Sequence, residues 1–189
     1  MLLDLRKGWK AYDDAYQAEE NPRRKKILGV MKDHIKWEVL GQPDRILESV
    51  SPDAVYYFYG LGEPTEMHGF DQIRAFYQGL ADSGANVLQL DIEHLAVADW
   101  GISAHGVWHQ PYPGSVLLED GGLVDGEGID DPDALYLVSQ RMGWFFPFTQ
   151  DEEPLLLNEI VYFDKLAIAV EKIPEGTVIS EPLTEAVFS

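Results

Sequence analysis

Three histidines on two neighbouring segments are the residues of this sequence best suited to proton transfer. The segments 86–97 (NVLQLDIEHLAV) and 101–110 (GISAHGVWHQ) have the residue pattern of two β-strands. Ala98-Asp99-Trp100 lies between them, so we expect a β-hairpin. A turn there places His94 opposite His105, Ile92 opposite Val107 and Leu90 opposite His109. Alternation then gathers all three histidines on one otherwise apolar face. Because imidazole both accepts and donates protons near neutral pH, we predict His94 and His105 as an acid–base pair and His109 as a second base.

Tyrosines on an earlier segment could assist this chemistry. The run 54–60 (AVYYFYG) is β-branched and aromatic, which is typical of a strand. Tyr57 and Tyr59 share one face of such a strand, and Tyr56 takes the other. A tyrosine hydroxyl that faces a pocket can polarise a carbonyl, so we predict Tyr57 or Tyr59 as a hydrogen-bond donor. Ordinary aromatic packing is the alternative.

A further group of residues is predicted to bind substrate. Arg141 could clamp a carboxylate, and the aromatic side chains could form pocket or interface walls. The predicted substrate-binding residues are Ile92, Trp108, Arg141, Trp144 and Phe146. Asp91 and Glu93 become candidate bases only if the hairpin register shifts by one residue. His34, inside a helical segment, is a lower-ranked candidate for the pocket.

No metal or cofactor is expected. His94 with His105 could chelate a metal, but no third ligand is evident, and His105 and His109 would lie about 13 Å apart along a strand. The acidic segment 111–133 lacks the spacing of a calcium loop, and no phosphate-binding or dinucleotide fingerprint is present.

The charge and cysteine content of the sequence limit the classes of partner and chemistry that we expect. The 189 residues carry a net charge of −19, and only four basic residues follow residue 50. This argues against nucleic acid and anionic membrane surfaces, since both are bound by clustered cations. The absence of cysteine excludes disulfides and thiolate chemistry. No apolar run is long enough for a transmembrane helix or a signal peptide, so we expect a cytoplasmic protein.

The elements that must position these residues indicate an α+β fold. Hydrophobic periodicity predicts helices over 4–20, 23–40, 43–50 and 70–84, and strands over 54–60, 86–97, 101–110, 134–149 and 154–164. Residues 165–173 could be a sixth strand or a short helix, and 60–69 and 111–133 are expected as loops. We divide the chain into an N-terminal arm (1–22), one pocket domain (23–175) with an acidic Gly-rich loop at 111–133, and a C-terminal tail (176–189).

Several of these segments resemble the nuclear transport factor two-like superfamily, in particular its SnoaL-like polyketide cyclase and dehydratase branch. The resemblance is carried by SPDAVYYFYG (51–60), MHGFDQIRAFYQGL (67–80), the hairpin 86–110 and LLLNEIVYFD (155–164). It implies a cone-shaped, curved antiparallel sheet with helices on its concave face, a cystatin-like α+β barrel, often dimeric through the other face. The N-terminal extension and the long 111–133 segment depart from the family pattern.

The resemblance also implies a range of functions. Family members include ketosteroid isomerase, limonene epoxide hydrolase, polyketide cyclases and scytalone dehydratase, which is similar in using a pair of histidines with tyrosines nearby. We therefore expect a cofactor-independent lyase or isomerase that dehydrates, isomerises or cyclises a hydrophobic, polyketide-like substrate, and a homodimer formed through the sheet. Fold does not settle chemistry, so a ligand-binding protein, a dimerising interaction domain and an epoxide or ester hydrolase remain alternatives.

Overall fold

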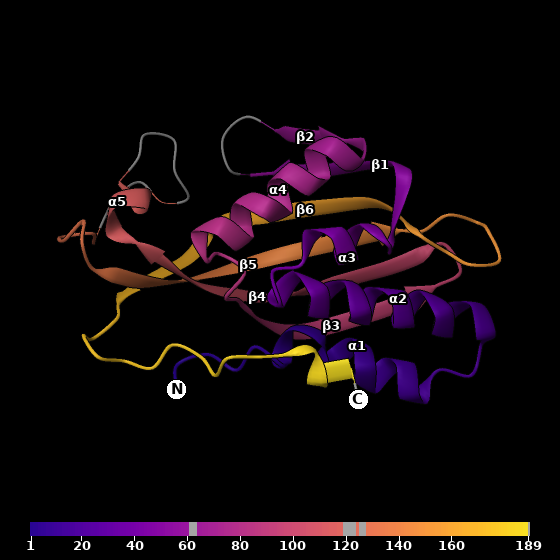
Figure 1. The fold of residues 1–189 in the computed structure, drawn as a ribbon, viewed down its shortest axis with the longest axis horizontal. Helices are drawn as coiled ribbons and strands as arrows, with labels where there is room; N and C mark the ends of the chain where they lie inside the picture. The colour runs from indigo at the N-terminus through magenta and orange to yellow at the C-terminus, as the bar shows by residue number, and fades with distance from the viewer. Residues whose placement is uncertain (61–63, 119–123, 125–127, 189) are drawn as a thin grey trace.

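The computed structural model describes residues 1–60, 64–118, 124 and 128–188, and its frame is one curved six-stranded sheet (Figure 1). The strand order is β2-β1-β6-β5-β4-β3. The strands are β1 (Val50–Tyr59), β2 (Thr65–His68), β3 (Gln89–Ala98), β4 (Gly101–Pro113), β5 (Leu135–Pro147) and β6 (Leu156–Lys172). This mixed architecture confirms the α+β fold class predicted from the sequence.

The main helices pack against one face of this sheet, and the core lies between the two layers (Figure 1). The helices are α1 (Lys7–Ala18), α2 (Pro22–Val39), α3 (Pro43–Leu47), α4 (Gly69–Ser83) and the short α5 (Gly114–Leu117), with a 3-10 turn at Glu185–Phe188. The sequence determines the start of α2 locally: the Asn21 side chain accepts hydrogen bonds from the amides of Arg23 and Arg24, and Pro22 occupies the first turn.

Four features of the sheet differ from, or decide between, the sequence-based expectations. Residues 65–68, expected in a loop, form the edge strand β2, which pairs antiparallel with β1. One pair in the sheet, β1 with β6, is parallel rather than antiparallel. The segment 165–173 continues β6 instead of forming a helix, and β4 runs to Pro113, into the segment expected as the acidic loop. Glu119, Asp120, Asp125 and Glu127 of that loop lie outside the described residues.

A β-bulge in the hairpin of β3 and β4 decides which side chains face the core. His94 pairs with His105 as predicted, but the register shifts between Ile92 and His94. Below the shift, Ile92 pairs with Gly106, whereas alternation had placed it opposite Val107. A Cβ on Gly106 would collide with the carbonyl oxygen of Asp91, so glycine permits the close approach of the two strands here.

The C-terminal tail runs beside the N-terminal segment (Figure 1). The amides of Leu2 and Leu3 donate to the carbonyl oxygens of Val178 and Ile179, and Phe188 stacks on Trp37 of α2. In the part of the chain that the structure describes, none of the helices combines the length and the apolar character needed to cross a membrane.

Candidate active site

A cavity of about 190 Å³ lies between the helices and the inner face of the sheet. Most of its wall is apolar, from α4 and strands β1, β4, β5 and β6: Phe58, Phe76, Leu80, Trp108, Val138, Met142, Trp144, Val161 and Phe163. Five polar side chains enter this wall and could do chemistry or bind a polar group: Glu38, Gln110, Tyr112, Gln140 and Glu159. Two larger hollows, of about 480 and 490 Å³, are more open and are lined largely by charged and loop residues.

A buried chain of hydrogen bonds, from Ser49 through His34 to Tyr77, leads toward this cavity. Ser49 Oγ donates to the carbonyl oxygen of Ile46 at 2.5 Å, so it accepts the 2.7 Å hydrogen bond from His34 Nδ1. Burial lowers the pKa of His34 to about 3, which keeps the ring neutral with a single N–H. His34 Nε2 is therefore the acceptor in its 2.9 Å contact with the Tyr77 hydroxyl.

This arrangement determines how Tyr77 meets the cavity. Its oxygen also lies 3.4 Å from the Tyr56 hydroxyl and 3.3 Å from Glu159 Oε2. A hydroxyl has one proton, so His34, Tyr56 and Glu159 compete for it, and donation to Glu159 favours the ionised carboxyl. Burial raises the pKa of both tyrosines, so their hydroxyls stay neutral.

Two carboxyls in the cavity wall have pKa values near neutrality. Burial raises the pKa of Glu159 to about 7, although the hydrogen bond with Tyr77 opposes this rise. Burial and the charge of Glu159 raise the pKa of Glu38 to about 8. Both side chains are only half-buried by surface area, because the cavity itself exposes them. Such a pair can hold one proton and one charge near pH 7, as acid–base catalysis requires.

Gln140 on β5 adds an unused hydrogen-bond donor. Its side chain is 2% exposed, and its Nε2 has no hydrogen-bond partner among the described residues. Gln110, also in the wall, is by contrast satisfied: it donates to the carbonyl oxygen of Ala85 and accepts from Trp108 and Tyr112. A buried amide without a partner is unfavourable by about 1–3 kcal/mol, and an oxygen atom of a bound ligand would relieve this.

The three hairpin histidines do not lie among these residues. Because of the bulge, Leu90, Ile92 and Trp108 point to the inner face of the sheet, whereas the histidines point to the outer face. The predicted common face of histidines and apolar residues is therefore wrong. His94 and His105 stack on each other on the outer face, with ring centroids 5.9 Å apart. Glu93 beside them binds Arg141 in two hydrogen bonds of 2.5 and 3.0 Å.

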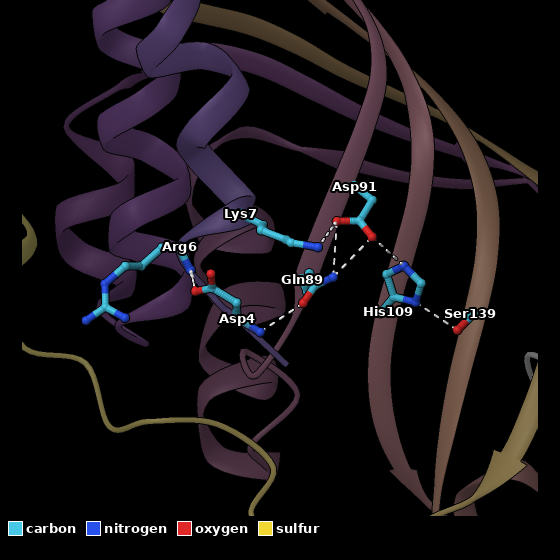
Figure 2. A network of polar contacts seen from close by, with 7 residues as sticks. All are labelled: Asp4, Arg6, Lys7, Gln89, Asp91, His109 and Ser139. Atoms are coloured by element: carbon cyan, nitrogen blue, oxygen red, sulfur yellow. Dashed lines mark hydrogen bonds and ion pairs between the residues drawn. The ribbon is translucent and has the colours of Figure 1, made fainter. Parts of the chain in front are cut away.

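His109 belongs to a polar network at the β3 edge, beside the start of α1 (Figure 2). Its Nδ1 contacts Ser139 Oγ at 2.8 Å, and its Nε2 lies 3.3 Å from Asp91. Asp91 also accepts from Lys7 at 3.0 Å and from Gln89 at 3.1 Å. These contacts connect the first helix to the sheet and occupy both ring nitrogens of His109.

The other predicted site residues divide between the cavity and the rest of the fold. Trp108 and Trp144 line the cavity. Tyr57 and Tyr59 stack on each other, 6.3 Å apart, on the outer face, whereas Tyr56 points inward. The remaining three lie elsewhere: Phe146 is part of the hydrophobic core, Ile92 packs against that core, and Arg141 lies on the outer face of the sheet.

Apart from His34, which was a lower-ranked candidate, sequence reasoning missed the interior polar residues, although weak signals existed. Glu38 follows His34 by four residues, which places both on one helix face. Glu159 interrupts an apolar strand and alternates with Val161 and Phe163, which line the cavity. Tyr77 lies four residues after the buried Ile73 on α4. Periodicity alone does not show that these faces enclose an empty space.

Comparison with known proteins supports the architecture. No protein-family model and no curated protein matches the sequence. A protein from Shewanella putrefaciens CN-32, provisionally named a SnoaL-like polyketide cyclase, is 12% identical, with a TM-score of 0.57 over 83% of this chain and 89% of its own. A provisionally named SnoaL-like polyketide cyclase from Jannaschia sp. CCS1 is 15% identical, with a TM-score of 0.56 over 78% of this chain and 92% of its own.

A third similar structure has a described role. It is SalBIII, an epoxide hydrolase/cyclase-like enzyme in pyran ring formation of the polyether salinomycin, which is 13% identical. The match has a TM-score of 0.55 and covers 80% of this chain and 98% of SalBIII. At such identities the likeness concerns the fold alone. The chain therefore has the nuclear transport factor two-like fold, in the form that it takes in SnoaL-like polyketide cyclases.

Proposed function

We propose that the interior cavity is a cofactor-independent acid–base site for a small, largely apolar substrate that carries a carbonyl oxygen. The reaction class is dehydration, isomerisation or cyclisation. The observation that carries the proposal is the pair of carboxyls, Glu38 and Glu159, in an otherwise apolar wall beside the unpartnered Gln140 amide. The named cyclases and the cyclase-like enzyme of the same fold are consistent with this class of chemistry.

The roles of the two carboxyls follow from their proton affinities. Glu159, with the lower pKa of about 7, is the base and takes a proton from the carbon next to the substrate carbonyl. The C–H electron pair moves into an enolate, whose oxygen accepts a hydrogen bond from Gln140 Nε2. Glu38, with a pKa of about 8, is the acid.

The fate of the enolate then selects the reaction. In a dehydration, Glu38 gives its proton to a β-hydroxyl, the C–O bond breaks and water leaves. In an isomerisation, the proton returns at a different carbon. In both cases one proton is taken and one is given, so no redox partner is needed, and proton exchange between the carboxyls restores the starting state. Tyr77 and His34 position Glu159 through the buried hydrogen-bond chain.

The size of the cavity limits the substrate. A cavity of about 150 Å³ accommodates benzene, so about 190 Å³ suits a molecule with one small ring. The single donor at Gln140 and the aromatic wall suit a cyclic ketone better than a charged metabolite.

The test uses cyclohexanone as a probe in deuterated buffer near pH 7.5, with the loss of its α-proton signal followed by NMR. We expect the protein to accelerate deuterium exchange and Glu159→Gln to abolish the acceleration. Glu171→Gln, on the exposed end of the same strand, is the matched control and should exchange as the wild type does. Exchange equal to that of buffer, or unchanged in Glu159→Gln, would contradict the proposal; if cyclohexanone binds without exchange, the site binds ligands without catalysis.

We further propose that a second copy of the chain covers the aromatic part of the outer face of the sheet, around Tyr162. Its support is a row of outer-face aromatic rings in which Tyr59 stacks on Tyr162 at 5.1 Å and Phe145 meets Tyr162 at 6.1 Å. Tyr162 is 51% exposed and Phe145 41%. Sedimentation velocity should show a dimer that strengthens with salt, since salt screens the charge of −19 on each copy. Tyr162→Arg should give monomers, and a wild-type monomer at all salt concentrations would refute the dimer.

A cytoplasmic location stays a prediction from the sequence.

A further inference from the structure

We propose that Glu93, His94 and His105 form a binding site for a divalent transition metal ion, with zinc as the reference ion, on the outer face of the hairpin. The site lies away from the interior cavity and is independent of the acid–base chemistry proposed there. Its ligand atoms, one from each residue, lie within 4.8 Å of one another.

The bulge in β3 creates this cluster. In a regular strand, Glu93 and His94 would point to opposite faces of the sheet. The register shift leaves Glu93 as the extra residue between the pairs Ile92–Gly106 and His94–His105. Both side chains consequently reach His105: His94 stacks on it, and Glu93 Oε2 lies 3.6 Å from its Nδ1. The bulge thereby supplies the third ligand, which regular alternation could not.

The donor set matches a transition metal rather than calcium or magnesium. Two imidazoles and one carboxylate are the usual ligands of zinc, whereas calcium and magnesium prefer oxygen ligands alone. Tetrahedral zinc needs its ligand atoms about 3.3 Å apart. The side chains of Glu93 and His105 are 41% and 43% exposed, and His94 is also exposed, so small rotations can bring the three groups together.

The surroundings leave space for an ion. On its other side, His105 pairs with Gly143 of β5, where an added Cβ would meet no atom within 4 Å.

Arg141 is the competitor for this ligand. It holds Glu93 in two hydrogen bonds, so a metal ion must displace the guanidinium to bind the carboxylate. Removing the guanidinium should consequently strengthen metal binding. A merely structural role of the three residues does not predict this sign.

The test is calorimetric titration of the full chain with zinc chloride, compared with magnesium chloride. We expect one zinc ion per chain and no comparable magnesium binding. His94→Ala and Glu93→Gln should each weaken zinc binding about tenfold or more, since changes even beyond the ligands cost about 10–100-fold. Arg141→Met should tighten it.

His68→Ala is the matched control, because His68 also lies beside a carboxylate, with its Nε2 3.1 Å from Glu66. This variant should bind zinc as the wild type does, and circular dichroism should confirm that each variant is folded. The proposal is overturned if the wild type does not bind zinc, or if His94→Ala and Glu93→Gln both bind it unchanged. It is also overturned if His68→Ala loses zinc binding to the same extent. Weaker binding in Arg141→Met would also count against it.

Discussion

Replacing Glu159 by glutamine should stabilise the protein at alkaline pH and leave its stability unchanged in acid. Burial raises the pKa of this carboxyl from 4.5 to about 7. A raised pKa means that the folded state prefers the protonated form. Below pH 4.5 the carboxyl is protonated in both the folded and the unfolded state, so its ionisation does not lower the free energy of unfolding. As the pH rises through 7, folding must either retain a proton or bury a charge, and the free energy of unfolding falls.

The size of this effect follows from the shift. One pKa unit corresponds to about 1.4 kcal/mol, so the shift of Glu159 amounts to about 3 kcal/mol at most. Solvent inside the cavity and the coupling to Glu38 reduce the expected difference to about 2 kcal/mol at pH 8. Glutamine cannot ionise and retains a similar shape, so Glu159→Gln avoids this penalty.

The assay is urea unfolding of wild type and variant at several values between about pH 4.5 and about pH 8.5. Glu171→Gln removes one charge from an exposed position of the same strand and corrects for the self-repulsion of a protein with a net charge of −19. The reasoning is refuted if Glu159→Gln is less stable than the wild type at pH 8. It is also refuted if the difference between the two does not change with pH.

Three other substitutions test separate parts of the structure. Gln140→Leu should raise the free energy of unfolding by about 1 kcal/mol, because it removes a buried amide without a partner, and should weaken cyclohexanone binding measured by NMR. Gly106→Ala should lower the free energy of unfolding by about 2 kcal/mol or more, because the added Cβ would collide with backbone atoms. Gly143→Ala should not lower it, because the Cβ there meets open space, and urea unfolding compares the two variants. Ser49→Ala should cost about 1–3 kcal/mol in the same assay by leaving His34 Nδ1 without its acceptor.

Local patterns in the sequence were sufficient for most of the fold. The apolar stripe over 23–40 predicts α2 to within about one residue, and the hairpin turn predicts the pairing of His94 with His105. Edge strand β2 and the parallel pairing of β1 with β6 were missed. Both depend on contacts between segments distant in sequence, which single-segment periodicity does not report.

The candidate site was much harder to predict, for two physical reasons. One extra residue at Glu93 puts Leu90 and Ile92 on the face opposite to His94, so a correct turn still gave the wrong apolar neighbours for the histidines. The interior carboxyls come from elements far apart in the chain, Glu38 on α2 and Glu159 on β6. Their unusual proton affinity arises only when the fold buries them together, and no spacing in the sequence encodes it.

The most direct test of the interior site is a carbon-13 NMR titration of the glutamate side-chain carboxyls. Glu38→Gln and Glu159→Gln identify the two resonances by their loss. We expect these two to titrate with pKa values of about 8 and about 7, well above the ordinary 4.5, because the protein buries both groups beside each other. If both titrate below about pH 5.5, as solvent-exposed carboxyls do, the cavity holds no acid–base pair and the proposed chemistry is wrong.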